Sequence, residues 1–110
     1  MSTAGVALVW CPFPDEDSAQ DAAATLLDEG VIACANLLPG IRSLYRWRGE
    51  RGEAGEAGAL FKTSVALLDQ VVARLGELHP YETPAIVGWR ADAAAAPTQA
   101  WIGELGVERR

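Results

Sequence analysis

Two strand-like segments joined by a glycine-rich stretch constrain this fold more than any other feature of the sequence. Ile41–Arg48 alternates its side chains so that Ser43, Tyr45 and Trp47 fall on one face, which is the period of a β-strand. Glu56–Thr63 is a second apolar segment of strand length. The residues between them, 49–55, are rich in glycine, which is typical of a hairpin tip. We therefore expect an antiparallel hairpin with residues 49–55 as its loop.

This hairpin extends further towards the N-terminus. Val31–Leu38 is an apolar segment, and Pro39-Gly40 separates it from the alternating strand, which predicts a bend or bulge. Residues 31–63 then form one long, kinked hairpin whose outer half overhangs a domain of this size. That half would carry three aromatic side chains: Tyr45, Trp47 and Phe61. An apolar overhang with an open strand edge is covered either by copies of the same chain, which we favour, or by the chain's own C-terminal helix.

The other predicted elements flank the hairpin on both sides. In chain order they are a buried strand Val6–Cys11, a helix Asp15–Glu29, the hairpin 31–63, a helix that Ser64 caps and His79-Pro80 ends, a strand Ala85–Arg90 and a short helix that begins at Pro97. The order β-α-β-β-α-β predicts an α+β, ferredoxin-like sandwich with a long hairpin and a short C-terminal helix. Right-handed crossovers place the first strand between the third and the fourth. We expect residues 1–110 to form a single domain.

Composition narrows the choice of partners and of compartment. The chain has 110 residues and a net charge of −6, so nucleic acid is not an expected partner. The sequence holds no long apolar segment and no signal-peptide pattern, so we expect no membrane partner and a cytoplasmic location. The two cysteines, Cys11 and Cys34, form no Cys-x-x-Cys pair, and no disulfide is expected between them in a reducing compartment.

Six short stretches resemble, in this order and spacing, the CutA divalent-cation tolerance proteins over nearly the full length of the chain. They are Cys11–Glu16, Ala33–Asn36, Leu38–Gly40, Ser43–Gly49, Leu60–Thr63 with Glu56 before it, and His79–Pro84. The resemblance implies a ferredoxin-like fold, a tight homotrimer formed through the long strands, and a role linked to copper and other divalent cations. It also implies a likeness to the trimeric PII signalling proteins, which bind small regulators between subunits. Two functions are therefore expected: cation tolerance with weak copper binding, or a PII-like small-molecule sensor or scaffold with no specific metal.

The resemblance assigns the metal ligands to Cys11 and His79. A thiolate and an imidazole suit copper or zinc, but two ligands do not fill a site. Leu78 and Ala85 stand where other members carry further potential ligands. The residues alone also fit a structural interpretation, in which Cys11 is a small core residue and His79 ends a helix. The metal-binding and the structural interpretations both stay open.

Five residues of the shared pattern are candidates for binding a small molecule. They are Tyr45, Trp47, Glu56, Lys62 and Tyr81. They either line a cleft between subunits, with Glu56 and Lys62 orienting a ligand, or serve as interface anchors, which is a common role of Trp and Tyr.

No catalytic constellation is visible in the sequence. The chain has one His, so a nucleophile with a base and an orienting group is not expected, and we predict that the protein is not an enzyme. An acylphosphatase-like site needs cationic and amide donors after the first strand, whereas Pro12–Glu16 is acidic. A metallochaperone of this fold would use paired cysteines, which are absent from the sequence.

Overall fold

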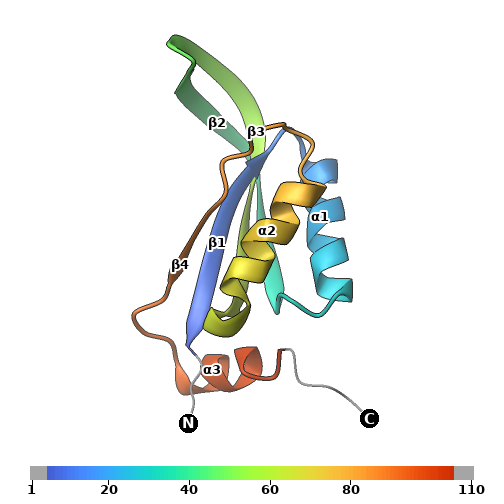
Figure 1. Cartoon of the computed structure of the whole chain (residues 1–110), viewed down its shortest axis with the longest axis vertical. Helices are drawn as coiled ribbons and strands as arrows, with labels where there is room; N and C mark the ends of the chain where they lie inside the picture. Colours follow the sequence, from blue (N-terminus) through green and yellow to red (C-terminus); the bar gives the residue numbers. More distant parts are fainter. Residues whose placement is uncertain (1–4, 106–110) are drawn as a thin grey trace.

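The computed structural model describes residues 5–105, which form a four-stranded antiparallel sheet and three α-helices (Figure 1). The elements are β1 (Val6–Phe13), α1 (Glu16–Asp28), β2 (Cys34–Trp47), β3 (Glu50–Ser64), the 3-10 turn η1 (Val65–Leu67), α2 (Leu68–Leu78), β4 (Val87–Arg90) and α3 (Ala96–Ile102). The strand order β2-β3-β1-β4 places β1 between β3 and β4, as the sequence predicts. The ferredoxin-like order of elements is therefore confirmed. Within the described residues, no helix is both long and apolar enough to cross a membrane.

Local side-chain and glycine signals place the helix boundaries close to where the sequence predicts them. The Asp15 carboxylate accepts a hydrogen bond from the Ser18 amide at 2.8 Å and so caps α1. Gly30 follows that helix with φ of 75°, a conformation that favours glycine. The Ser64 hydroxyl accepts from the Leu67 amide at 3.3 Å, so it caps η1, which leads into α2, rather than α2 directly.

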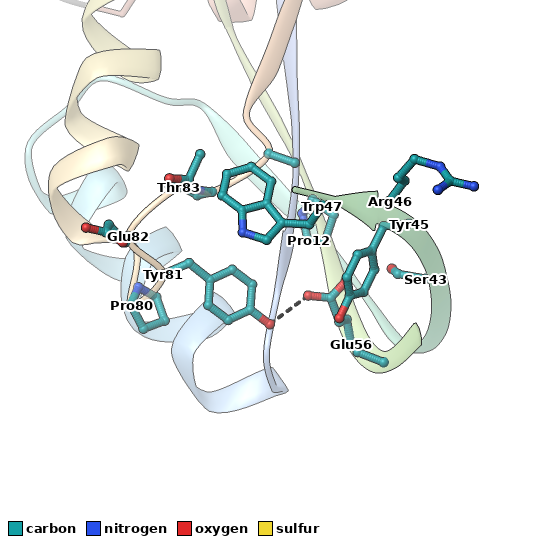
Figure 2. Close-up of a pocket in the computed structure, with 13 residues that line it drawn as sticks. Pro12, Ser43, Tyr45, Arg46, Trp47, Glu56, Pro80, Tyr81, Glu82 and Thr83 are labelled. Atoms are coloured by element: carbon teal, nitrogen blue, oxygen red, sulfur yellow. Dashed lines mark hydrogen bonds between the residues drawn. The ribbon is translucent and has the colours of Figure 1, made fainter. Parts of the chain in front are cut away.

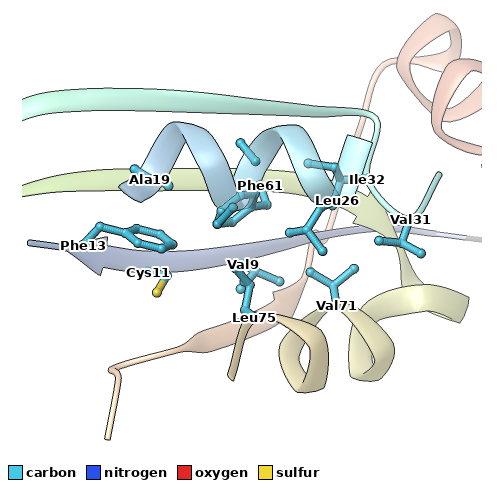
Figure 3. Packing of buried hydrophobic residues seen from close by; sticks show 13 residues of the cluster. Val9, Cys11, Phe13, Ala19, Leu26, Val31, Ile32, Phe61, Val71 and Leu75 are labelled. Carbon is cyan, nitrogen blue, oxygen red and sulfur yellow. The ribbon is translucent and has the colours of Figure 1, made fainter. Parts of the chain in front are cut away.

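The core lies between the helices and one face of the sheet. Val9, Cys11 and Phe13 of β1 alternate onto this face and are fully buried together with Phe61 of β3. Figure 3 shows these side chains meeting those of the helices. Val31 and Ile32 are also buried, although they precede β2, which begins at Cys34 rather than at Val31.

The opposite face of the sheet is also apolar but remains partly exposed. Trp10 lies opposite Leu60 on β3 and Val87 on β4, and Leu8 lies opposite Trp89. Val87 and Trp89 are 58% and 44% exposed. We call this surface the open sheet face. Since residues opposite one another in an antiparallel pair share a face, these side chains lie on one mostly apolar surface, which also holds Lys62 opposite Leu8.

The hairpin turns within two residues, so the predicted loop 49–55 is wrong. Trp47 pairs with Glu50, and the central residues Arg48 and Gly49 have φ of 52° and 82°, which is the signature of a type I′ turn. Gly52 and Gly55, which also suggested a loop, lie inside β3. Gly52 lies opposite Tyr45, and a Cβ on it would stand 2.6 Å from the Tyr45 ring, so the missing side chain makes room for an aromatic residue across the strands.

The kink and the overhang are both present. Between the pairs Leu38↔Gly58 and Ile41↔Glu56 the register shifts, which confirms the bulge predicted at Pro39-Gly40. Beyond it the strands pair only with each other, and this two-stranded overhang, residues 41–56, stretches the molecule to 48 Å.

Two details of the overhang differ from the sequence-based expectation. Phe61 does not lie in it, because it pairs with Val9 in the body of the sheet and is fully buried. The C-terminal helix α3 lies at the opposite end of the molecule (Figure 1), so it does not cover the overhang. The alternative in which the chain covers its own overhang is therefore wrong.

Candidate functional site

A cavity of about 810 Å³ lies where β1 ends and the overhang begins. One wall is the overhang, the other is the segment 80–85 between α2 and β4, and Pro12 of β1 lies between them. Figure 2 shows the side chains of Tyr45, Trp47, Glu56 and Tyr81 around the cavity. Glu82 of segment 80–85 also lines it. The structure thus brings together four of the five residues predicted to bind a small molecule.

A hydrogen bond joins the two walls of the cavity. The Tyr81 hydroxyl donates to Oε2 of Glu56 at 2.8 Å (Figure 2). Partial burial, and then the hydrogen bond to the Glu56 carboxylate and its negative charge, raise the pKa of Tyr81 to about 12. The hydroxyl therefore stays protonated at neutral pH and fixes Glu56 in place.

The buried His79 forms a hydrogen bond through each of its ring nitrogens, one with Tyr81 and one with Pro12. Its Nδ1 accepts from the Tyr81 amide at 3.1 Å, so this nitrogen carries no proton, and Nε2 must donate to the Pro12 carbonyl oxygen at 2.8 Å. The ring also stacks on Phe13, with centroids 4.4 Å apart and planes inclined by 21°. His79 thus ties the start of segment 80–85 to the end of β1.

Cys11 is close to His79 but is not presented to a ligand. The thiol is fully buried on the core face, and its Sγ lies 3.6 Å from the same Pro12 oxygen that accepts from His79. Burial, and secondarily the charge of Glu56, raise the pKa of this thiol from 9.0 to about 12. Since the thiolate is the metal-binding form, the environment opposes ligation.

These two residues do not form a ready metal site in this arrangement. A metal would have to deprotonate a buried thiol and release the imidazole from Pro12 or from Tyr81. No group of three or more His, Cys, Asp or Glu side chains suited to a metal occurs within residues 5–105. Copper binding by Cys11 and His79 stays a prediction, and this geometry favours weak binding.

Lys62 lies apart from the other predicted ligand-binding residues. It pairs with Cys34 and Leu8 in the middle of the sheet and does not line the cavity. Lys62 is six positions after Glu56 on β3, a distance of about 20 Å along an extended strand. The sequence pattern did not single out Pro12 or Glu82 as lining residues, because only the fold brings the end of β1 beside segment 80–85.

This fold and cavity define a class: a ferredoxin-like sandwich with an overhanging hairpin and an aromatic, acidic cavity at its base. The family model described as "CutA1 divalent ion tolerance protein" matches residues 7–105. The chain therefore belongs to the CutA1 divalent ion tolerance family. The resemblance seen in the sequence is confirmed.

Individual members of the family match this chain over most of their length. The chain is 40% identical over 97 residues to the divalent-cation tolerance protein CutA of Pyrococcus horikoshii, covering 88% of this chain and 94% of that one. It is 41% identical over 80 residues to the protein of the same name from Salmonella newport, covering 73% and 70%.

Solved structures of the family share the fold. The crystal structure of the divalent ion tolerance protein CutA1 from Ehrlichia chaffeensis has a TM-score of 0.87 at 28% identity, covering 94% of this chain and 96% of that one. CutA1 from Pyrococcus horikoshii has a TM-score of 0.83 at 40% identity, covering 89% and 95%.

Proposed function

We propose that this chain contributes to divalent-cation tolerance and works as a homotrimer of the family's kind. The observation that carries the proposed assembly is the open sheet face, which is mostly apolar and still partly exposed. The proposed tolerance is supported by the family, whose members are named for it. Exposed contiguous apolar surface on a single chain marks an interaction site. The number three follows from the resemblance to the CutA proteins.

The overhang gives a second reason for self-association. Residues 41–56 form a two-stranded ribbon, and such a ribbon is marginally stable in water on its own. Leu44 of this ribbon is 64% exposed and does not line the cavity. Contact with neighbouring copies would bury this side chain and cover the unpaired edge of β2.

A charge placed on the open sheet face tests the assembly. Val87→Glu puts a carboxylate on a side chain that is 58% exposed in one chain, so it should leave the fold intact and disrupt the trimer. Leu27→Glu is the matched control, because Leu27 is 47% exposed on α1, which packs on the other face. Light scattering coupled to size exclusion should give smaller particles for Val87→Glu alone. Trimers from both variants would argue against this interface.

The cellular role can be tested by complementation. A copper-sensitive bacterial strain that lacks its own family member should regain growth at raised copper when it expresses this chain, and Val87→Glu should restore less. Growth that is the same with the chain as with an empty vector would argue against a role in tolerance. Fractionation of the same cells tests the cytoplasmic location that we propose from the two free cysteines.

Weak copper binding at Cys11 and His79 is the metal part of the proposal. Coordination through either ring nitrogen costs the hydrogen bond that this nitrogen makes with Pro12 or Tyr81, about 1 kcal/mol, and the buried Cys11 thiol must also lose its proton, so the affinity should fall below that of a preformed site. Calorimetric titration of Cu²⁺ and Zn²⁺ into the chain and into Cys11→Ala tests it. Equal uptake by both proteins would exclude Cys11 as a ligand.

The cavity supports a second candidate function, the binding of a small molecule. Its volume lies in the range of small-ligand pockets, and a cross-wall hydrogen bond between Tyr81 and Glu56 holds two polar groups in place. We assign this site a binding role rather than a catalytic one. The His79 nitrogens are both engaged and the Cys11 thiol is buried and neutral, so neither serves as base or nucleophile.

A further inference from the structure

We propose that the cavity selects a small organic cation, of the alkylammonium class, and holds it between the aromatic rings and Glu56. This inference rests on the proposed ligand-binding role of the cavity and names the chemistry of its ligand. The side chains that would hold the cation belong to one chain and come from the overhang and from segment 80–85.

Aromatic rings supply the apolar part of the site. Tyr45 and Trp47 of the overhang and Tyr81 of the other wall all line the cavity, and they are 49%, 48% and 39% exposed (Figure 2). The faces of such rings are negative and attract cations within about 6 Å of the centroid. Trp47 already shows this behaviour, because the guanidinium carbon of Arg48 lies 5.2 Å from its ring centroid.

The fixed charges of the cavity have the sign that a cation needs. Glu56 and Glu82 line it, and the negative charges of Glu56 and Asp15 are felt at the Tyr81 hydroxyl, where they help to raise the pKa to about 12. Among the described residues, Arg46 is the one basic side chain in the lining. Its guanidinium donates to the Gly49 carbonyl at 3.3 Å and points away from Tyr81 in Figure 2. An anion would therefore meet net repulsion here.

Glu56 is held where it can meet the cationic head. Its Oε2 accepts from Tyr81, which fixes the carboxylate without neutralising it. A carboxylate has lone pairs for several donors, so a ligand N–H can share it with the phenol. Such a charge-assisted hydrogen bond is about twice as strong as a neutral one. The alkyl part of the ligand would then lie against the rings.

Three probes of equal chain length separate charge from hydrophobicity. Butylammonium, 1-butanol and butyrate are titrated into the full chain in its native oligomeric state, and the indole N–H of Trp47, assigned with Trp47→Phe, is followed by two-dimensional NMR. We expect saturable shifts with butylammonium and at least tenfold weaker binding of the other two.

Two charge-removing variants locate the effect. Glu56→Gln should weaken butylammonium binding at least tenfold. Glu53→Gln is the matched control, since it removes the same charge from the same hairpin; Glu53 pairs with Arg42 at 3.1 Å and does not line the cavity. The affinity of the Glu53→Gln variant for butylammonium should equal that of the unaltered chain.

The remaining outcomes separate this inference from the role on which it rests. Saturable binding of butanol or butyrate that equals that of butylammonium, unchanged in Glu56→Gln, would overturn the cation selectivity and leave the cavity as a ligand site. Absence of any saturable shift would overturn both the cation selectivity and the ligand-binding role of the cavity. Neither binding result tests the proposed trimer, which is tested separately by measuring the particle mass.

Discussion

Replacing His79 tests whether this side chain, rather than a bound metal, holds the cavity wall in place. His79→Phe keeps a ring that can stack on Phe13 but removes the hydrogen bonds to the Pro12 oxygen and from the Tyr81 amide. His79→Ala removes the hydrogen bonds and the ring together. The pair of variants therefore separates the polar from the aromatic contribution.

The structure gives the expected magnitudes. Each lost hydrogen bond contributes about 1 kcal/mol, so His79→Phe should lower the free energy of unfolding by about 2 kcal/mol. His79 is 7% exposed and its ring lies 4.4 Å from that of Phe13, so the loss of this burial and stacking adds about 1 to 2 kcal/mol in His79→Ala.

Urea unfolding followed by tryptophan fluorescence measures both values. All proteins must be compared at one concentration, because the stability of an oligomer depends on it, and without metal, so that no bound ion contributes. A loss below about 0.5 kcal/mol in His79→Phe would refute the role of the two hydrogen bonds. Equal losses in the two variants would refute the contribution of the ring stack.

Three further predictions follow from single features of the structure. The Cys11 thiol should resist a disulfide reagent at pH 8 until the protein unfolds, which a thiol count on Cys34→Ala checks; rapid reaction would contradict its burial. Because folding raises the Cys11 pKa from 9.0 to about 12, the neutral thiol stabilises the fold below pH 9, and stability should fall by about 1.4 kcal/mol per pH unit between pH 9 and 12. Urea unfolding should show this slope in excess over Cys11→Ala, and identical slopes would contradict it. Gly49→Ala should cost about 1 kcal/mol, because Gly49 has φ of 82° in the turn, and an unchanged urea midpoint would contradict the turn geometry.

The order of the elements was predictable because each carries its own local signal. The apolar run of β1, the acidic residues at the start of α1 and the glycine after α1 act within a few residues, and both elements lie within a few residues of where the sequence places them. The hairpin loop was not predictable in the same way. Gly52 resembles a turn residue in the sequence, but its role depends on Tyr45 across the strand pair, which only the register reveals.

The candidate site was predictable in its residues but not in its geometry. The cavity brings together four residues as expected: Tyr45, Trp47, Glu56 and Tyr81. Lys62 lies further along β3, because residues that share a face of a strand can still be far apart along it. The resemblance alone could not reveal that both nitrogens of His79 are engaged, since hydrogen bonds to backbone groups leave no mark on sequence spacing.

Native mass spectrometry of the purified full chain tests the proposed trimer. We expect a particle of three times 11.7 kDa at micromolar concentration, because the open sheet face and the overhang remain exposed in a single chain. A particle with the mass of one chain under the same conditions would refute self-association through these surfaces.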